Sequence, residues 1–239
     1  AARVADRSAG RAADASLLGA YATVQADAAG RFEAFVLYDR ARGDARTDQA
    51  TPGGRWLLSR PGFEFAAEAN LQHGTRDDAD VRAWLASASA GPVLADGRAG
   101  IALAWHLASG GTPDDAVRRV IDTRWGTAHR YHGYADLFTN PPVHTGGRGL
   151  SNPVLQARWP ASPALELMLA LPAFRTADSA GLASARLAEE ADLTVRYRFR
   201  DAITLLGGVS AVRAGPGLTD LGRLERDMTW AFVMLTAGF

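Results

Sequence analysis

The C-terminal segment, residues 228–239, constrains the fold more than any other part of the chain. Every second side chain counted back from its end is apolar: Phe239, Ala237, Leu235, Val233 and Ala231. Because successive side chains of a strand point to opposite faces of a sheet, this segment would present one unbroken apolar face. It is also long enough to cross a bilayer when tilted, since about ten residues suffice. An apolar face that ends on an aromatic residue is typical of the last strand of an outer-membrane β-barrel, so we expect lipid outside the sheet and polar side chains inside it.

Most of the chain follows the same two-residue period, and Gly, Pro and Asp separate the alternating segments. No segment keeps a helical period, and no apolar run approaches the ~18 residues that a transmembrane helix needs. The pattern predicts an all-β chain, a transmembrane antiparallel up-and-down β-barrel with about 11–12 strands, folded as a single domain over residues 1–239. Besides 228–239, we expect strands at 17–26, 31–40, 55–60, 63–74, 80–89, 98–110, 150–159, 164–173, 191–200 and 203–213.

The connections between these strands alternate in length. Short turns are expected near residues 28, 61, 96, 161 and 201, and longer links at 42–54, 74–79, 111–149, 177–190 and 214–227. If Phe239 lies on the periplasmic side, every short turn falls on that side and every longer link lies outside. This requires 111–149 to be one long extracellular loop that contains no full crossing. A soluble sandwich has no reason to separate its loop lengths in this way.

The strand count predicts that this chain is the C-terminal portion of a larger barrel. A closed bacterial barrel needs an even number of strands, and an open sheet edge cannot face lipid. The pattern gives about eleven strands, so we expect further strands that precede residue 1. A strand hidden in residues 1–16 is the alternative, although that stretch is rich in Arg, Ala and Asp and reads poorly as a strand.

Composition excludes several classes of function. The 26 basic and 26 acidic residues balance, so the net charge of the chain gives no indication of a nucleic-acid partner. The chain has no cysteine, which excludes disulfides and Cys-based zinc sites. It also has no lysine, so every basic side chain is an arginine, whose forked donors suit carboxylate or phosphate guests.

Several ordered blocks resemble the C-terminal half of the alginate-export family of outer-membrane porins. Residues 129–138 are similar to a loop block of that family and match it at His129, Tyr131, Gly133, Tyr134 and Asp136. Weaker matches are Ala173-Phe174-Arg175, Glu190-Ala191-Asp192-Leu193 and the Pro216-Gly217 pair, and together the blocks cover roughly residue 17 to the end. The sequence departs from the family pattern at His132, at Ala135 and in the stretch before Pro216, which lacks the usual aromatic residue.

The resemblance implies export of alginate, a polyuronate, through an arginine-rich pore. It also implies a barrel of roughly eighteen strands, within the range known for such proteins. Independently of the resemblance, we expect the long segment that contains this block to form a plug or a loop lid folded over the pore mouth.

The strand at 191–200 has the clearest candidate pore-lining face. Arg196, Arg198 and Arg200 follow one another at every second position, ~7 Å apart on one face, and Asp192 shares that face. Such a positive ladder on a pore wall selects anions, and carboxylates would pass along it by forked hydrogen bonds. Further pore-lining candidates are Arg158, Gln156, Arg82, Arg55, Glu64 and Glu68. Aromatic residues near the predicted strand ends are expected to form interfacial girdles: Trp230, Trp159, Tyr197, Tyr38 and Trp56.

The predicted function is a passive channel in the outer membrane of a Gram-negative bacterium, without cofactor or metal. It would conduct an anionic polysaccharide or another acidic solute, with outer-membrane lipid and lipopolysaccharide around it and periplasmic export machinery as a partner. One alternative is an outer-membrane barrel enzyme, for which the sequence offers no catalytic motif. Another is a soluble β-sandwich or lipocalin-like binding module, which the apolar faces argue against. A metal cluster of His129, His132, Tyr134 and Asp136 is not favoured, because loop histidines are common and no second-shell pattern accompanies these residues.

Overall fold

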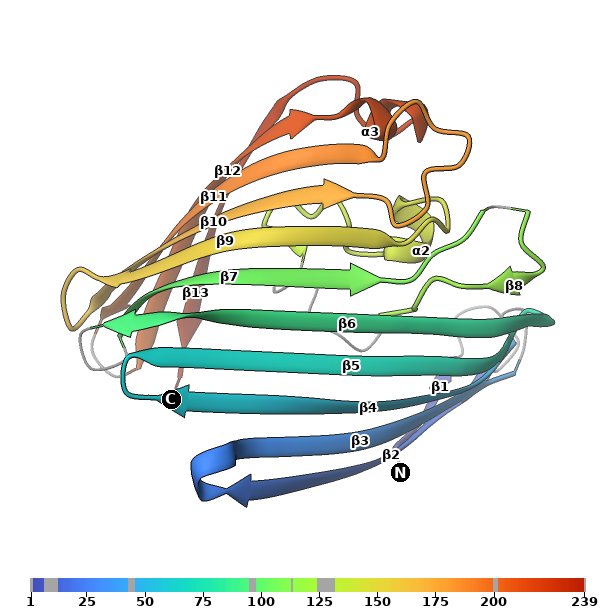
Figure 1. The fold of residues 1–239 in the computed structure, drawn as a ribbon, viewed down its shortest axis with the longest axis horizontal. Coiled ribbons are helices and arrows are strands. Elements are labelled where there is room, and N and C mark those ends of the chain that lie inside the picture. Colours follow the sequence, from blue (N-terminus) through green and yellow to red (C-terminus); the bar gives the residue numbers. More distant parts are fainter. Residues whose placement is uncertain are drawn as a thin grey trace.

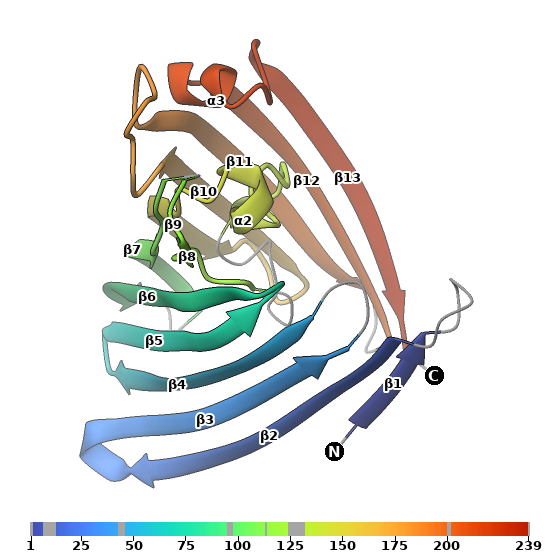
Figure 2. The same cartoon turned by 90° about the vertical axis from the view of Figure 1, so that its right-hand side faces the viewer.

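The chain forms one strongly curved β-sheet. The computed structural model describes residues 2–6, 13–42, 46–94, 98–112, 114–123, 132–199 and 202–238. Twelve strands follow one another across the sheet in chain order, each antiparallel to its neighbour, and the short β8 adds a parallel pair beside β6 (Figures 1 and 2). The strands are β1 (Ala2–Asp6), β2 (Ala13–Ala26), β3 (Gly30–Ala41), β4 (Thr47–Arg60), β5 (Phe63–Arg76), β6 (Ala79–Leu94), β7 (Ala99–Ala108), β8 (Val117–Arg118), β9 (Leu150–Pro160), β10 (Leu165–Arg175), β11 (Arg186–Phe199), β12 (Ile203–Ala214) and β13 (Met228–Ala237). The antiparallel up-and-down order is the one that the sequence predicts.

The helices are short and lie outside the sheet ladder. They are η1 (Asp27–Ala29), α2 (Pro141–His144) and α3 (Pro216–Asp220). In the described ranges, no helix has the length and apolar character needed to cross a membrane.

The sheet is open, with β1 and β13 at its two edges. Within the described residues, no backbone ladder joins these two strands. Figure 2 shows the sheet as a curved wall around a hollow, into which the segment between β7 and β9 folds. β1 is a strand that the sequence pattern missed, and it brings the antiparallel path to twelve. The path of twelve agrees with the predicted 11–12 strands and confirms the alternative of a strand within residues 1–16, whereas the larger barrel of roughly eighteen strands stays a prediction that rests on the resemblance.

β4 is longer than its sequence pattern indicates. Residues 47–54 were expected in a loop because Pro52 is followed by two glycines, yet they continue the strand. Pro52 lies opposite Val36 of β3, whereas the pairing with β5 is interrupted between Ala50 and Gly53. Because proline has no N–H, it can keep its place beside one neighbour while the ladder to the other is broken. Tertiary pairing therefore outweighs the local turn signal.

The two ends of the sheet differ as predicted. Residues 27–29, 61–62 and 161–164 make short connections at one end, where β13 also finishes. The opposite end carries the longer segments 109–149, 176–185 and 215–227. The expected longer link at 74–79 is instead a tight turn at Asp77 and Asp78, because β5 and β6 both continue towards it. We call the two ends the turn end and the loop end.

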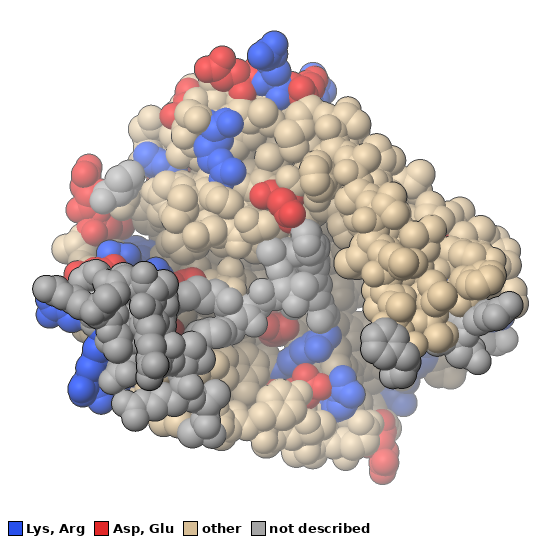
Figure 3. Space-filling model, turned by 180° about the vertical axis from the view of Figure 1, so that it is seen from behind, with Lys and Arg blue, Asp and Glu red and all other residues tan. Residues whose placement is uncertain are grey.

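The convex face of the sheet is apolar over most of its area. Its large exposed side chains include Leu18, Val36, Trp56, Leu71, Trp84, Leu103, Leu155, Leu169, Leu193, Val209 and Val233. Charged side chains on this face, such as Arg82 and Glu189, lie towards the loop end. Figure 3 shows a broad uncharged band on the wall, with charged atoms at its loop end and in the hollow. A lipid-facing barrel wall has this distribution.

Aromatic side chains gather on the convex face near the turn end. The rings of Phe32 and Trp56 stack with centroids 5.7 Å apart, and Phe65 meets Trp56 edge-on at 4.9 Å. Trp159 and Tyr197 lie on the same face. The girdle prediction is wrong for Trp230, which lies opposite the buried Ser210 and so belongs to the concave face.

Candidate functional site

The long segment between β7 and β9 folds into the hollow at the loop end. Its apolar side chains Ile121, Leu137 and Phe138 are buried against the concave face of the sheet. The Phe138 and Phe174 rings lie 4.7 Å apart, and both side chains are fully buried. The concave face therefore carries a cluster of apolar side chains at the loop end, and this segment covers them. In the described residues of the segment no strand crosses the sheet, and β8 pairs with only two residues of β6.

One arm of this segment is held by β5. Gln72 donates a hydrogen bond to the Asp122 carbonyl oxygen at 3.3 Å and accepts one from the Asp122 N–H at 2.9 Å. Arg76 also forms an ion pair with the Asp122 carboxylate. These contacts satisfy loop backbone groups that would otherwise be buried without partners.

The other arm, residues 132–135, is held by two carboxylates of β11. The Ala135 N–H donates to Glu190 Oε1 at 2.9 Å, and the Tyr134 N–H donates to Asp192 Oδ2 at 3.4 Å. Both carboxylates are buried on the concave face, and Asp192 also accepts a hydrogen bond from Ser210. Gly133 has a φ of +75°, and a Cβ there would lie 2.5 Å from Glu190 Oε1. Only glycine therefore fits between this turn and the Glu190 carboxylate.

An aromatic stack ties the same arm to the last strand. The Tyr134 and Phe232 rings are nearly parallel, with centroids 5.2 Å apart and planes 14° apart. Phe232 in turn lies over Gly208, where a Cβ would be only 2.5 Å from the ring. Because aromatic pairs add about 0.5–1.5 kcal/mol beyond area burial, the stack is a second anchor for the segment. We call residues 132–149 the lid, and its contacts with Glu190, Asp192 and Phe232 the latch.

The lid contains a buried histidine next to the latch. Burial lowers the pKa of the His132 imidazole from 6.5 to about 4, and His106 and His144 contribute to the same shift. His132 is therefore neutral at pH 7, and the docked lid disfavours its proton.

Acidification is expected to loosen the lid. Because the docked pKa is the lower one, the contribution of His132 is complete above pH 6.5 and is lost progressively as the pH falls towards 4. The slope is at most about 1.4 kcal/mol per pH unit. Hydrogen exchange of the lid amides between pH 7 and pH 5 measures this loss. His132→Phe, which cannot titrate, should flatten the pH dependence, whereas an unchanged profile in that variant would assign the effect to other groups.

Paired charges line the concave face outside the lid. Arg55 lies 3.9 Å from Glu33, Arg158 lies 3.9 Å from Glu64, and Arg196 lies 3.6 Å from Glu166. Arg198 donates to the Pro163 carbonyl oxygen at 3.1 Å, and Glu68 accepts from Asn70 at 2.9 Å. Gln156 and Asp192 share this face. The arginines thus stand among carboxylates, so the described wall is mixed in charge rather than a bare positive ladder.

Arg82 is the one described candidate that faces the other way. Val81, Ala83 and Leu85 are buried under the lid, so strand alternation turns Arg82 outward beside Trp84. Its side chain is 72% exposed and lies 3.6 Å from Asp80. The prediction that Arg82 lines the pore is wrong, because the inner face of β6 is apolar at this height. Arg200, His129, Tyr131 and Phe239 lie outside the described residues.

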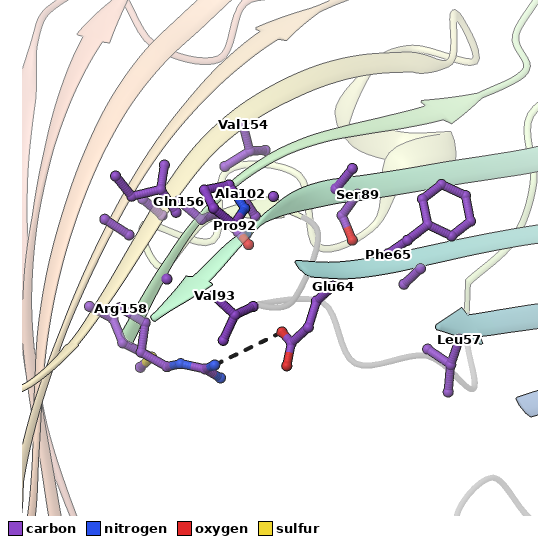
Figure 4. Close-up of a pocket in the computed structure, with 18 of the residues that line it drawn as sticks. Leu57, Glu64, Phe65, Ser89, Pro92, Val93, Ala102, Val154, Gln156 and Arg158 are labelled. Atoms are coloured by element: carbon purple, nitrogen blue, oxygen red, sulfur yellow. Dashed lines mark ion pairs between the residues drawn. The ribbon is translucent and has the colours of Figure 1, made fainter. Parts of the chain in front are cut away.

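A cavity of about 720 Å³ lies in the hollow, next to Gly133 and Tyr134 of the lid. Several predicted pore-lining residues border it, namely Glu64, Gln156, Arg158 and Asp192. Figure 4 shows Glu64 and Arg158 reaching towards each other from β5 and β9 at its edge. The structure therefore brings together side chains from distant parts of the chain around one cavity. In the part of the chain that the structure describes, no group of three His, Asp or Glu side chains could hold a metal ion.

Comparison with known proteins identifies the fold. No protein-family model matches the chain, and no curated protein sequence matches it either. Among solved structures, Salmonella typhi OmpF in complex with daunomycin matches 94% of this chain and 62% of its own length, with a TM-score of 0.57 and 14% identity. Pseudomonas aeruginosa OccK5 (OpdH) matches 95% of this chain and 67% of its own length, with a TM-score of 0.51 and 12% identity. The chain has a porin-type fold, an antiparallel up-and-down sheet like the wall of an outer-membrane β-barrel.

The porin-type fold agrees with the predicted fold class. The NanC porin also matches, covering 94% of both chains with a TM-score of 0.49 and 6% identity. This chain spans less than two thirds of the OmpF length. None of these three structures is named as an alginate-export protein, so that resemblance stays a prediction.

Sequence reasoning missed most of the latch. The sequence indicates Glu190 only as the start of a strand, and it predicts no role for Phe232 or Gly208. A signal was present in β13, where Trp230, Phe232 and Met234 occupy positions that alternation assigns to the inside. Apolar residues on the inner face of a barrel strand indicate that something packs against that face.

Proposed function

We propose that this porin-type protein forms an outer-membrane channel for the passive diffusion of acidic solutes, with an anionic polysaccharide of the polyuronate type as one candidate. The observation that carries the proposal is the division between the two faces of the sheet. The convex face is apolar, whereas the concave face holds arginines and carboxylates around a cavity with a lid across its mouth. This division suits a wall between lipid and water.

The geometry of the arginines supports an acidic solute. The ion pair of Arg196 with Glu166 is long, at 3.6 Å, and the Arg196 side chain is 46% exposed. Exposed pairs of this kind contribute only about 0–1 kcal/mol, so a solute carboxylate can compete for the guanidinium. Many weak sites favour conduction, because a permeating solute must leave each site as easily as it enters.

The proposal sets a requirement for the sheet edges. Lipid offers no hydrogen-bond partners, so the outer backbone groups of β1 and β13 must be paired in the membrane. Lipid and lipopolysaccharide would surround the convex face. An export role would also require periplasmic machinery at the turn end.

The alternatives explain less of the structure. A soluble sandwich or lipocalin-like module needs its apolar faces covered, yet in the described residues no second layer packs on the convex face. An enzyme needs a nucleophile or acid–base pair at the rim, and the carboxylates of the latch are instead occupied by loop amides. We therefore propose a channel without catalytic activity.

Charge reversal tests the proposed selectivity. The double variant Arg196→Glu and Arg198→Glu should shift the ion preference of the reconstituted channel several-fold towards cations, because it also leaves Glu166 facing a like charge. Reversal potentials in planar bilayers under a salt gradient measure the preference.

Arg82→Glu is the matched control, since this arginine lies on the convex face near the loop end. It should leave the preference near that of the unmodified protein. Unchanged selectivity in the double variant would exclude the β11 arginines from the conducting path.

A further inference from the structure

Three arginines gather on the convex face where β10, β11 and β12 run side by side to the loop end (Figure 1). Arg175 of β10 lies directly opposite Arg186 of β11, because a β-bulge at Phe174 and Arg175 shifts the register there. Without the bulge, Arg175 would lie opposite Leu187. Like charges at directly opposite positions destabilise a sheet, so this pairing favours an anion between the two guanidinium groups.

The anion that the chain itself supplies is Glu189, and it serves two arginines at long range. Its carboxylate lies 3.8 Å from Arg186 and 4.0 Å from Arg213 of β12, whose side chains are 40% and 70% exposed. Both distances exceed the ~2.7–2.9 Å of a charge-assisted hydrogen bond, so the carboxylate leaves these guanidinium donors unused. Arg175 is exposed, and its side chain makes no hydrogen bond or ion pair with any residue that the structure describes. We call Arg175, Arg186 and Arg213 the arginine cluster.

The loop end beside the turn between β5 and β6 is arranged differently. Three arginines there each face a different aspartate at a shorter distance, so their charges are matched. The pairs are Arg46 with Asp78 at 3.3 Å, Arg82 with Asp80 at 3.6 Å and Arg118 with Asp77 at 3.2 Å.

A shallow hollow of about 460 Å³ adjoins Arg213. Its border includes Ala191, Ala211 and Thr229, whose small side chains lie side by side on the convex face of β11, β12 and β13. Asp227 also borders the hollow, and its carboxylate accepts a hydrogen bond from a backbone N–H at the end of β12 at 3.0 Å. Two carboxylates therefore stand against three arginines, and the surface beside them has room for a bulky group.

The arginine cluster lies at the height of lipid headgroups. Arg175 is six residues beyond Leu169, which lies near the middle of β10. Six residues span ~20 Å along a strand, or ~15 Å along the membrane normal at a tilt of about 40°. The apolar band of a barrel wall is about 25 Å tall, so its edge is ~12 Å from the middle. The cluster therefore lies just beyond the hydrocarbon, in the leaflet next to the loop end.

We propose that the arginine cluster binds the phosphate of an outer-leaflet lipid headgroup, namely the lipid A part of lipopolysaccharide. A phosphate between Arg175 and Arg186 would accept the forked hydrogen bonds that Glu189 leaves unmade, and arginine suits phosphate for this reason. The headgroup sugars would lie over the hollow, and the acyl chains would follow the exposed Leu171 and Leu193 below it. The inference rests on the proposed outer-membrane location and adds the place where one lipid is held.

Lipid binding to the full chain in detergent tests the inference without requiring a conducting channel. Native mass spectrometry should show bound lipid A that carries both phosphates, whereas dephosphorylated lipid A with the same acyl chains should bind about tenfold more weakly. The double variant Arg175→Gln and Arg186→Gln should lose this preference, and Arg213→Gln should reduce it. Arg82→Gln is the matched control, because Arg82 lies at the same end of the convex face and has its own aspartate.

Inorganic phosphate separates a lipid site from a site for soluble anions. In large excess it should not displace lipid A, because it lacks the acyl chains that hold the headgroup against the wall. The inference is overturned if the double variant keeps the full preference, if both lipids bind the unmodified chain equally, or if inorganic phosphate displaces the lipid. The comparison of the two lipids needs only the unmodified chain, so it decides the question even where a variant fails to fold.

The channel proposal is tested separately. The Arg196 and Arg198 reversal experiment can be carried out in bilayers that contain no lipopolysaccharide. A normal shift there, together with equal binding of the two lipids here, would reject the lipid site and leave the channel proposal standing.

Discussion

Replacing Leu169 by arginine is expected to prevent stable assembly in a membrane. Leu169 lies near the middle of β10 on the convex face, where it is 42% exposed and faces Leu193 of β11. An arginine on the lipid face at the bilayer midplane costs about 2–4 kcal/mol, a large part of the roughly 5–15 kcal/mol by which folded domains are stable. Urea titration of the protein folded into lipid vesicles measures the loss.

Met168→Arg is the matched control, because the neighbouring residue points into the cavity on the concave face. Water is available there, so this variant should fold almost as well as the unmodified protein. If Met168→Arg were the more damaging substitution, the assignment of the two faces would be reversed. Equal tolerance of both arginines in plain buffer would argue for a soluble protein.

Glu190→Ala is expected to release the lid and raise the conductance of the channel. The variant removes the acceptor of the Ala135 N–H and leaves that buried donor unsatisfied. The loss of a buried hydrogen-bond partner costs about 1–3 kcal/mol, enough to shift a docked lid towards an undocked population. Single-channel recordings should show larger and noisier currents, and the amides of residues 132–149 should exchange faster.

Glu189→Ala serves as the comparison, since Glu189 is half-exposed and points to the convex face one position earlier. Its ion pairs with Arg186 and Arg213 are 3.8 and 4.0 Å long, so their loss should change little. Normal currents and normal exchange in Glu190→Ala would show that the lid does not depend on this carboxylate.

The fold was predictable because lipid imposes one rule on every strand. Apolar side chains at every second position, such as Leu193, Tyr197 and Leu235, show that one face of each strand is apolar. This is enough to predict which face of the sheet points outward. The errors occur where local signals and pairing disagree. The sequence around Pro52 predicts a turn, yet pairing with β3 keeps this residue in β4. The other case is β1, whose sequence has too little apolar character to be recognised as a strand.

The candidate site was predictable only in part. Alternation places Arg55, Arg158 and Arg196 on the concave face, but it says nothing about which carboxylates meet them across the sheet. The sequence pattern also predicts the wrong face for Arg82. The inner face of β6 is apolar at the loop end, where the lid packs against it, so Arg82 points outward. Contacts between the lid and β11 join residues far apart in the chain, and such pairings leave no local periodic signal.

The latch has a consequence for the order of assembly. The described latch partners of Tyr134, Asp192 and Phe232, both follow it in the chain, on β11 and β13. The arm formed by residues 132–135 can therefore dock fully only after β11 and β13 are in position. A chain in which β13 has not yet paired lacks the Tyr134–Phe232 stack, so full docking of this arm reports that β13 is in place.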